Sequence, residues 1–285
     1  MIVDYKQHDE YLEQARRDNI PLGLGLGIDL DNNLRWKRAN FNIVLGHANV
    51  GKTLWVLWYL TSLSKLHNLK HLINSSENTI EDIKIDVIEL YSGKKIKELS
   101  LNELEIAKKF VNKHFDFIDT SKLRTLDEFM KEVQALPKVK QYDNLMIDPH
   151  NSFLKPYGVN SHDYDYQMAS KLRQFAKKFQ TTIYLCVHGV TEALRKVHPK
   201  EHDFAGLTMP CNMADAEGGG KWGNRADDFL VIHRYINSST DWMFTDLHIK
   251  KIKNTRSGGR PTFADEPIRF KLNNNKFLCN GKSAI

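Results

Sequence analysis

Apolar and polar residues alternate along most of the chain in two patterns: short apolar runs that suit buried strands, and longer segments with helical spacing. The strand-like runs lie at 41–46, 71–77, 115–120, 144–148 and 181–188. Helical spacing is found at 53–66, 79–91, 101–114, 125–136 and 166–179. Strands that alternate with helices are typical of βαβ units. The pattern therefore predicts an α/β fold with a mainly parallel, twisted sheet and helices on both of its faces.

The last part of the chain has a different pattern, in which apolar runs follow one another without helices between them. These runs lie at 229–234, 243–253, 268–272 and 276–280. Asn-rich turn residues join the last two runs, which predicts a C-terminal β-hairpin. At the other end, residues 4–18 have the pattern of a short polar helix. We therefore expect an N-terminal linker helix or arm over residues 1–19 and one α/β domain over residues 20–285.

Composition narrows the class of protein without defining its activity. The chain has 285 residues, of which 41% are hydrophobic, so it can bury a sizeable core. Its three cysteines are far apart in sequence and have no metal-ligand spacing, which favours a reducing compartment. The polar N-terminus is unlike a signal peptide and no apolar run is long enough to span a membrane, so we expect a cytoplasmic protein of a bacterium or a phage-infected host, with no membrane partner. The net charge of +6 makes a polyanion such as nucleic acid a plausible partner.

The segment GHANVGKT, residues 46–53, stands between the first strand-like run and the helical pattern that follows it. It fills the pattern G-x-x-x-x-G-K-[ST], in which small residues let backbone N–H groups curl around phosphates. The lysine reaches the β and γ phosphates, the hydroxyl binds Mg²⁺, and the helix N-terminus adds a favourable dipole. The alternative is a glycine turn with a surface Lys-Thr pair. We expect ATP or another NTP to bind this loop, through Gly46, His47, Ala48, Asn49, Val50, Gly51, Lys52 and Thr53.

Two acidic residues at the ends of apolar runs suit the rest of such a site. Asp148 ends the run 144–148, where a carboxylate can serve with Thr53 as the second protein anchor for Mg²⁺, although buried strands also end in Asp for turn reasons. Glu77 ends the run 71–77, where we expect the strand next to the P-loop strand to finish. A carboxylate there can orient the attacking water for hydrolysis. The alternative for the segment around Glu77 is a helix cap, because a helical pattern follows it.

The order of GHANVGKT, SSE, LMID, YLCVHG and KIKNTRSGG resembles the RecA-like motor domain of DnaB-type, superfamily 4, hexameric replicative helicases. Within that group, the chain is most similar to phage ring helicases, mitochondrial Twinkle-like helicases and stand-alone plasmid RepA-like helicases. The resemblance covers roughly residues 20–275. It implies a RecA-like P-loop NTPase fold and a role in DNA replication.

The resemblance also implies catalytic roles for five residues: Lys52, Glu77, His188, Lys253 and Arg256. Glu77 would be the catalytic base, and His188 would fall where the family has a polar sensor of the γ-phosphate. A structural histidine at the end of an apolar strand is the alternative for His188. Lys253 and Arg256 would be the basic pair, including an arginine finger, that reaches the nucleotide of the neighbouring subunit. The family spacing is K-x-R and this chain has K-N-T-R, so Arg260 is a second candidate for the finger, and a solvated basic strand is the alternative for the whole segment.

In the related helicases, the loops after the Walker B strand and the sensor strand face the DNA. Here these loops are residues 149–165 and 191–228, and the second has more than 30 residues without a predicted element. Acidic residues among its cations leave an ordinary surface loop as an alternative, and GGGKWGNRADD departs from the glutamine-containing motif of the family. The expected DNA-binding residues are Arg195, Lys196, Lys200, Lys221 and Arg225.

The sequence thus predicts a ring-forming replicative DNA helicase that couples ATP hydrolysis to movement on single-stranded DNA and to duplex unwinding. The resemblance implies a homo-oligomer in the form of a hexameric ring, whose N-terminal helix packs on the adjacent subunit unless it is a frayed terminus. It also implies a primase or another replisome protein as a partner. A RecA-like recombinase or mediator ATPase and a nucleotide-gated regulatory ATPase without DNA are the alternatives.

Overall fold

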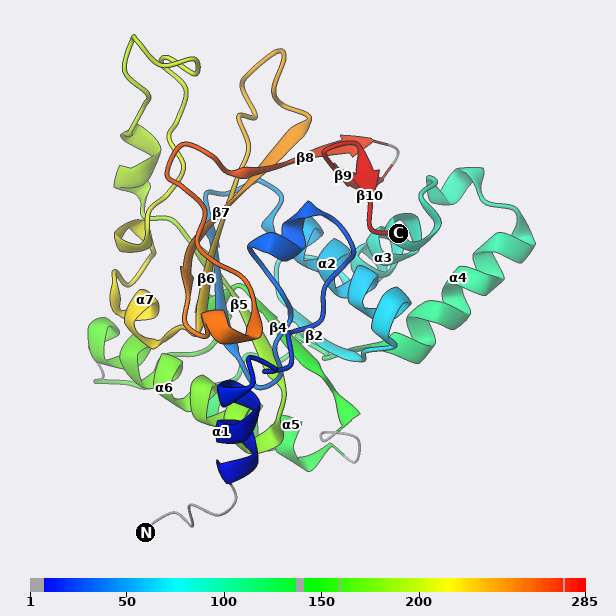
Figure 1. The fold of residues 1–285 in the computed structure, drawn as a ribbon, viewed down its shortest axis with the longest axis vertical. Coiled ribbons are helices and arrows are strands. Elements are labelled where there is room, and N and C mark those ends of the chain that lie inside the picture. Colours follow the sequence, from blue (N-terminus) through cyan, green and yellow to red (C-terminus); the bar gives the residue numbers. More distant parts are fainter. Residues whose placement is uncertain (1–7, 137–140, 159, 274) are drawn as a thin grey trace.

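A computed structural model describes residues 8–136, 141–158, 160–273 and 275–285 (Figure 1). Within these residues, ten strands form one sheet in the order β10-β9-β8-β7-β6-β1-β5-β4-β2-β3. The pairs that join β6, β1, β5, β4, β2 and β3 are parallel, and those that join β6 to β10 are antiparallel. The strands are β1 (Phe41–Gly46), β2 (His71–Ser75), β3 (Phe115–Phe117), β4 (Asn144–Asp148), β5 (Thr182–His188), β6 (Asp228–His233), β7 (Phe244–Ile252), β8 (Ile268–Asn273), β9 (Lys276–Cys279) and β10 (Lys282–Ser283).

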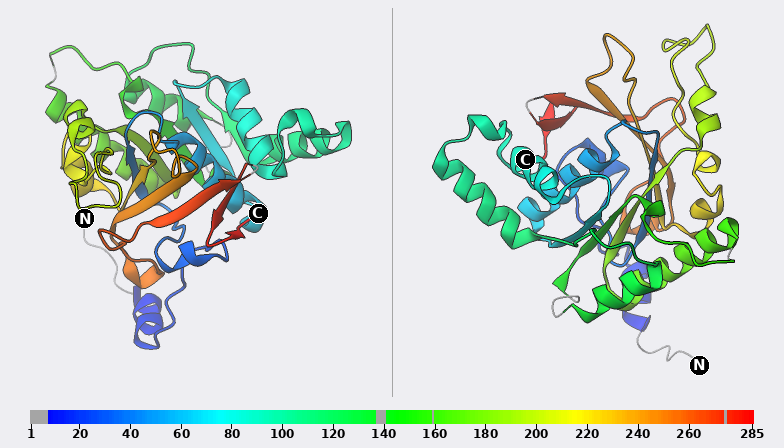
Figure 2. Two further views of the ribbon diagram at one scale, coloured as in Figure 1. Left: turned by 90° about the horizontal axis from the view of Figure 1, so that it is seen from above. Right: turned by 180° about the vertical axis from the view of Figure 1, so that it is seen from behind.

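Helices cover both faces of this sheet, which confirms the predicted fold class. The helices are α1 (Asp9–Arg16), α2 (Lys52–His67), α3 (Ile80–Ser92), α4 (Leu101–His114), α5 (Leu126–Ala135), α6 (Ser161–Phe179) and α7 (Lys221–Arg225). One core lies between the sheet and α2, α3 and α4, and a second lies between the sheet and α5, α6 and α7. Alternate residues of β1 enter the two cores, with Ile43 in the second and Val44 in the first. Figure 2 shows α4 projecting beyond the sheet on the side of the first core.

The C-terminal strands are held against α2 by aromatic side chains. Trp58 of α2 packs on Phe270 of β8 and Phe277 of β9, with ring centroids 5.2 and 5.3 Å apart. All three side chains are fully buried, and burial of large apolar surfaces is the main stabilising contribution in such a core. The hairpin of β8 and β9 agrees with the predicted C-terminal hairpin, and it closes the first core at its edge.

A buried polar network fixes the segment that leads into β1. The Trp36 indole N–H donates to Asn144 Oδ1 at 2.7 Å, and Asn144 Nδ2 lies 3.0 Å from His71 Nδ1. His71 Nε2 lies 2.7 Å from Ser64 Oγ, so the network joins residues from β4, β2 and α2. Every one of these four side chains is buried, so each polar atom depends on its protein partner.

Two details differ from the sequence prediction. The N-terminal helix covers Asp9–Arg16 and buries none of its side chains, while residues 4–7 of the predicted helix lie outside the described residues. Residues 221–225, expected in a loop, form α7, because Trp222 is fully buried in the second core and anchors this turn. In the described part of the chain, no helix is long and apolar enough to cross a membrane.

Candidate nucleotide-binding site

The carboxyl ends of β1, β5 and β4 lie side by side and carry most of the predicted site residues. Gly46 of β1 is level with His188 of β5, and β4, which ends at Asp148, pairs with the other edge of β5. The expectation that the strand before Glu77 lies next to the P-loop strand is wrong, because β5 and β4 stand between β1 and β2. Glu77, two residues beyond β2, still reaches the site through its long side chain.

The loop between β1 and α2 has two residues in the left-handed backbone region, as a tightly curled loop needs. Asn49 and Gly51 have positive φ angles of 61° and 85°, so the chain curls before α2 begins at Lys52. A Cβ added at Gly46 would lie 2.5 Å from the Ile232 carbonyl oxygen, so only glycine allows this approach of β1 and β6. The nearest atom to a Cβ added at Gly51 is a guanidinium nitrogen of Arg234 at 3.6 Å, so the Arg234 side chain lies against this side of the loop.

Lys52 is buried and its ammonium group lies inside the loop. Its Nζ donates to the carbonyl oxygens of Gly46 at 3.2 Å and His47 at 2.8 Å, and it lies 3.3 Å from His188 Nδ1. An ammonium group has three protons, and these three contacts use all of them. The cation is therefore placed at the centre of the loop, where an anionic ligand would compete for it.

Thr53 and Asp148 are in direct contact, although they come from different elements. Thr53 Oγ1 donates to Asp148 Oδ2 at 2.6 Å. Asp148 is fully buried, and burial raises the pKa of its carboxyl group, with the nearby Glu77 charge adding to the effect. The other oxygen, Oδ1, has no hydrogen-bond partner among the described residues. A hydroxyl next to a buried carboxylate with an orphaned oxygen is a donor set that suits Mg²⁺, so these two residues fit the predicted metal site.

His188 lies between the P-loop lysine and the predicted catalytic carboxylate. Its Nε2 is 2.9 Å from Glu77 Oε1, while its Nδ1 faces Lys52. These contacts are compatible in the tautomer that carries the proton on Nε2, which donates to Glu77 and leaves Nδ1 to accept from Lys52. The cap of α3 is Thr79, whose hydroxyl accepts from the Asp82 N–H, so Glu77 does not cap this helix.

Lys253 and Arg256 lie at the opposite end of the sheet from the P-loop of the same chain. The last residue of β7, Ile252, pairs with Asp228, which is level with Asn42 in β1. Gly46 is four positions after Asn42, which is about 13 Å along a strand, and the chain continues away from that level at Lys253. Lys253 pairs with Asp227 at 3.4 Å, and Arg256 and Arg260 are exposed. Arg256 therefore cannot serve the P-loop of its own chain.

Two of the predicted DNA-binding residues, Lys196 and Lys200, lie on a hairpin-like part of the segment between β5 and β6, and a third, Arg195, ends the short 3-10 helix that precedes it. Arg195 and Lys200 are exposed, and Lys196 is paired with Asp215. Isolated bridges pair Val197 with Thr208 and His198 with Ala205, so this segment is more ordered than a free loop.

The other two predicted DNA-binding residues are on or at the end of α7. Lys221 is buried and lies 3.4 Å from Asp165, so the expectation that it is an accessible loop cation is wrong. Its burial follows from the short helix that Trp222 anchors. Arg225 is half-buried, with its guanidinium 4.3 Å from the centroid of the Tyr166 ring.

Sequence reasoning did not identify Arg234 or His150. Arg234 follows β6, lies against Gly51 and donates to the Trp242 carbonyl oxygen at 2.6 Å. It lines a cavity of about 320 Å³ together with Lys94, Lys95, Glu98, Trp242, Met243, Leu272 and Asn275. His150, two residues after Asp148, is buried, and burial together with the charge of His188 lowers its pKa to about 4. The only sequence signal for either was a polar residue near the end of an apolar run.

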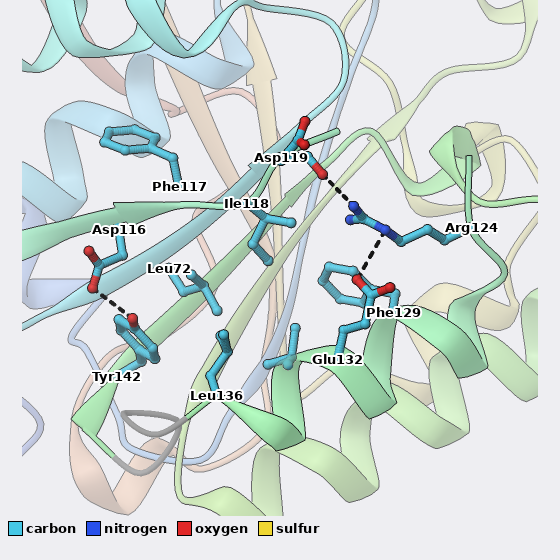
Figure 3. A pocket seen from close by; sticks show the side chains of 11 residues that line it. Leu72, Asp116, Phe117, Ile118, Asp119, Arg124, Phe129, Glu132, Leu136 and Tyr142 are labelled. Carbon is cyan, nitrogen blue, oxygen red and sulfur yellow. Dashed lines mark hydrogen bonds and ion pairs between the residues drawn. The ribbon is translucent and has the colours of Figure 1, made fainter. Parts of the chain in front are cut away.

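A larger cavity, of about 500 Å³, lies apart from this site, between β3 and α5 (Figure 3). Leu72, Phe129 and Leu136 form part of its apolar lining, and Arg124 pairs with Glu132 at its rim. It shares no lining residue with the P-loop site.

Comparison with known proteins defines the class of fold. No protein-family model matches the chain, and no curated protein matches it. Among solved structures, the ATPase domain of a phage helicase matches with a TM-score of 0.77 and 14% identity, over 98% of this chain and 99% of that one. A DnaB-like replicative helicase, described with its interactions with primase, matches with a TM-score of 0.72 and 14% identity, over 97% of this chain and 67% of that one.

The chain therefore has a RecA-like P-loop NTPase fold. It is the fold of DnaB-like helicase ATPase domains, which confirms at the level of structure the resemblance that the ordered motifs indicated.

Proposed function

We propose that this chain is the motor of a ring-forming replicative DNA helicase, which uses ATP or another NTP to move along single-stranded DNA and separate duplexes. The observation that carries the proposal is the convergence of Lys52, the Thr53–Asp148 pair and the His188–Glu77 pair at the ends of four strands. The fold shared with helicase ATPase domains supports a motor over other NTPases.

The nucleotide would be held by the loop from Gly46 to Thr53. Lys52 and the loop N–H groups would bind the phosphates, and Thr53 with Asp148 would hold Mg²⁺. When bound, Mg²⁺ neutralises charge on the phosphates and orients them for in-line attack. The guanidinium of Arg234, which lies against Gly51, would contact the nucleotide at this side of the loop.

Hydrolysis would depend on Glu77, whose carboxylate would align a water and accept its proton. The side chain of Glu77 is about half exposed and bonded to His188, so it can leave this contact when water enters. His188 touches both Glu77 and Lys52, and it would report the presence of the γ-phosphate to the chain that follows β5.

Arg256 would complete the site of a neighbouring subunit, because it cannot reach its own. This geometry requires a heterologous, head-to-tail assembly, and a hexameric ring is the closed form we propose. The backbone of Gly23 donates to the Ser257 carbonyl oxygen, so the segment after α1 lies beside the arginine turn. The exposed Tyr11 and Leu12 of α1 would pack on the adjacent subunit.

Single-stranded DNA would pass along the segment between β5 and β6, where Arg195, Lys196 and Lys200 would contact phosphates. Arg225 would extend this contact, and Lys221 would support α7 from inside. A primase or another replisome protein would be a further partner, by analogy with the DnaB-like helicase described with primase.

The test is ATP hydrolysis by the purified chain with and without single-stranded DNA, at two salt concentrations. Strong stimulation that falls with salt is expected, because phosphate contacts release counterions. Glu77→Gln should abolish turnover, and Lys52→Ala should lose nucleotide binding or turnover. A rate of ATP hydrolysis that does not change when DNA is added would refute the proposed DNA motor. A normal rate in Lys52→Ala would refute the proposed nucleotide site.

Particle shape with an ATP analogue is the second measurement. Closed rings are expected. Extended filaments would refute the ring helicase and support the alternative assignment as a RecA-like recombinase.

A further inference from the structure

The side chain of His47, although it belongs to the P-loop, turns toward the segment between β5 and β6. It is buried, and its Nε2 lies 3.2 Å from the Met209 carbonyl oxygen. The Cys211 sulfur lies 3.4 Å from Nε2 and 3.6 Å from Nδ1 of the same ring. One residue of the nucleotide-binding loop thus contacts two residues of the proposed DNA-contacting segment.

The ring makes a consistent set of hydrogen bonds in its neutral form. Burial lowers the pKa of His47, and the nearby Lys52 charge adds to this effect. With the proton on Nε2, the ring donates to the Met209 carbonyl oxygen, while the Cys211 sulfur packs against the ring at similar distances from both nitrogens. The contact with Met209 is therefore directional, and the contact with Cys211 is one of close packing.

Close packing leaves little room for His47 and the segment to move independently. A Cβ added at Gly189 would lie 2.8 Å from the Cys211 sulfur and 3.2 Å from His47 Nδ1. Gly189 itself donates to the Gly46 carbonyl oxygen at 3.2 Å. In a close-packed cluster, a displacement of one side chain is transmitted to its neighbours.

Beyond this contact, the chain forms a hairpin over residues 196–209, which we call the 196–209 hairpin. Met209 N–H donates to the Lys196 carbonyl oxygen at 2.8 Å, and His198 N–H donates to that of Leu207 at 2.9 Å. The hairpin carries Lys196 and Lys200. Met209, the residue that His47 holds, is at the base of this hairpin.

Nucleotide binding would give the P-loop end of the contact a second arrangement. Lys52 donates to the His47 carbonyl oxygen at 2.8 Å, and its other two protons are used by Gly46 and His188. A phosphate that binds Lys52 must displace at least one of these contacts. Release of the His47 carbonyl would free its backbone, and the ring would carry that change to Met209 and Cys211.

We infer that His47 is a positioning residue that couples nucleotide binding at the P-loop to the placement of the 196–209 hairpin. This inference rests on the proposed function, because the hairpin matters for DNA binding only if its lysines contact DNA as proposed. It describes a route separate from His188, which reaches the same segment through β5. A ligand can move the hairpin only if it interacts differently with the two arrangements, and the Lys52 contacts supply that difference.

Hydrogen exchange of the backbone amides in residues 196–211, measured without DNA and with or without saturating Mg-ATPγS, tests this inference. In the unmodified chain, nucleotide should change exchange in this segment by about fivefold or more, a typical strength for coupled sites. His47→Leu should reduce the change to near onefold even when nucleotide binding is shown to be saturated. His47→Gln, whose amide can donate in place of Nε2–H, should restore much of it.

Two further variants serve as a matched control and as a second test of the contact between His47 and Cys211. His67→Leu is the matched control, because His67 Nε2 also contacts a backbone carbonyl, that of Gly25 at 2.7 Å, away from the hairpin. It should respond like the unmodified chain. Gly189→Ala places a methyl group between His47 and Cys211 and should weaken the response if His47→Leu does not fold.

A full nucleotide response in His47→Leu, or in Gly189→Ala where that variant decides, would overturn the inference. The DNA-dependence of ATP hydrolysis is measured separately in the unmodified chain. If nucleotide changes exchange in a His47-dependent way but DNA does not stimulate ATP hydrolysis, the coupling through His47 is supported and the helicase proposal is refuted. If DNA stimulates ATP hydrolysis but neither variant changes the exchange response, the helicase proposal is supported and the coupling through His47 is refuted.

Discussion

Arg256→Ala should stop ATP hydrolysis without destabilising the subunit. Arg256 is exposed in a short turn, Thr255–Ser257, and surface substitutions of this kind change the free energy of unfolding by about 0.5 kcal/mol or less. An arginine supplied to a neighbouring site stabilises the transferring phosphoryl group, and its loss costs about 10³-fold or more in turnover. Nucleotide binding should remain, because the P-loop and its Mg²⁺ anchors are intact.

Mixed rings give a quantitative test of sharing between subunits. The alignment of β7 with β6 and β1 puts Arg256 more than about 13 Å along the sheet from its own P-loop, so in the proposed ring Glu77 and Arg256 of one site would come from two chains. In rings of equal parts Arg256→Ala and Glu77→Gln, about one site in four receives both functional residues if subunits mix at random. Turnover near a quarter of the unmodified value is therefore expected, while each variant alone stays inactive.

The assay is steady-state ATP hydrolysis, with native mass spectrometry to show that both variants occur in one ring. Arg260→Ala is the matched control, because Arg260 is also exposed, lies four positions after Arg256 and stacks on Phe263 of its own chain. It should keep most of its turnover. Mixed rings that demonstrably form and remain as inactive as their parents would refute the shared site. An Arg260→Ala chain that is inactive alone but regains turnover when mixed with Glu77→Gln would move the role to Arg260.

Three further predictions concern the metal, pH and the buried network. Thr53→Val should raise the Mg²⁺ concentration needed for half-maximal turnover by about tenfold or more, measured by Mg²⁺ titration, and an unchanged requirement would exclude the hydroxyl as a ligand. Burial lowers the pKa of His233 to about 3 and of His248 to about 4. As the pH falls below about 6.5, these two side chains therefore bind protons in the unfolded chain but stay neutral in the folded chain. Their contribution to the free energy of unfolding is complete above about pH 6.5 and is lost as the pH falls toward 4, by about 3 kcal/mol per pH unit for the pair, and urea unfolding at pH 7 and pH 5 should show it. Asn144→Leu should cost about 2–6 kcal/mol, because two buried partners lose their hydrogen bonds, whereas the exposed Asn102→Leu should be near neutral by the same denaturation assay.

The histidine prediction has its own control. No ring nitrogen of His233 or His248 has a well-formed hydrogen bond among the described residues, and the Thr208 backbone offsets the burial of His233 only in part. His233→Phe with His248→Phe should flatten the pH dependence of the unfolding free energy between pH 7 and pH 5. An equally steep dependence in that double variant would assign the acid sensitivity to other groups.

Local pattern determined much of this protein. The apolar run and the glycines around GHANVGKT specify a strand, a curled loop and a helix, because each depends on residues that are neighbours in the chain. The predicted strands and helices are observed within a few residues, and the hairpin of β8 and β9 follows from its turn residues. The ordered motifs were also enough to indicate the fold that the solved structures share.

The order of the strands, and with it the site, was decided only by the tertiary structure. A parallel strand can enter a sheet at several positions with the same apolar pattern, so nothing local places β5 between β1 and β4. That order brings His188 to both Lys52 and Glu77, and the antiparallel course of β7 carries Arg256 away from the P-loop.

Burial of single polar side chains was equally outside the reach of the sequence. Lys221 reads as a loop cation, yet the packing of Trp222 buries it beside Asp165. His47 reads as a phosphate-loop residue, yet its ring meets Cys211 from a segment more than 160 residues later. The sequence by itself determined which elements form and which loop can hold phosphates, because those depend on neighbours in the chain. The tertiary structure alone decided which distant side chains meet, because that depends on how the sheet is ordered and what its helices cover.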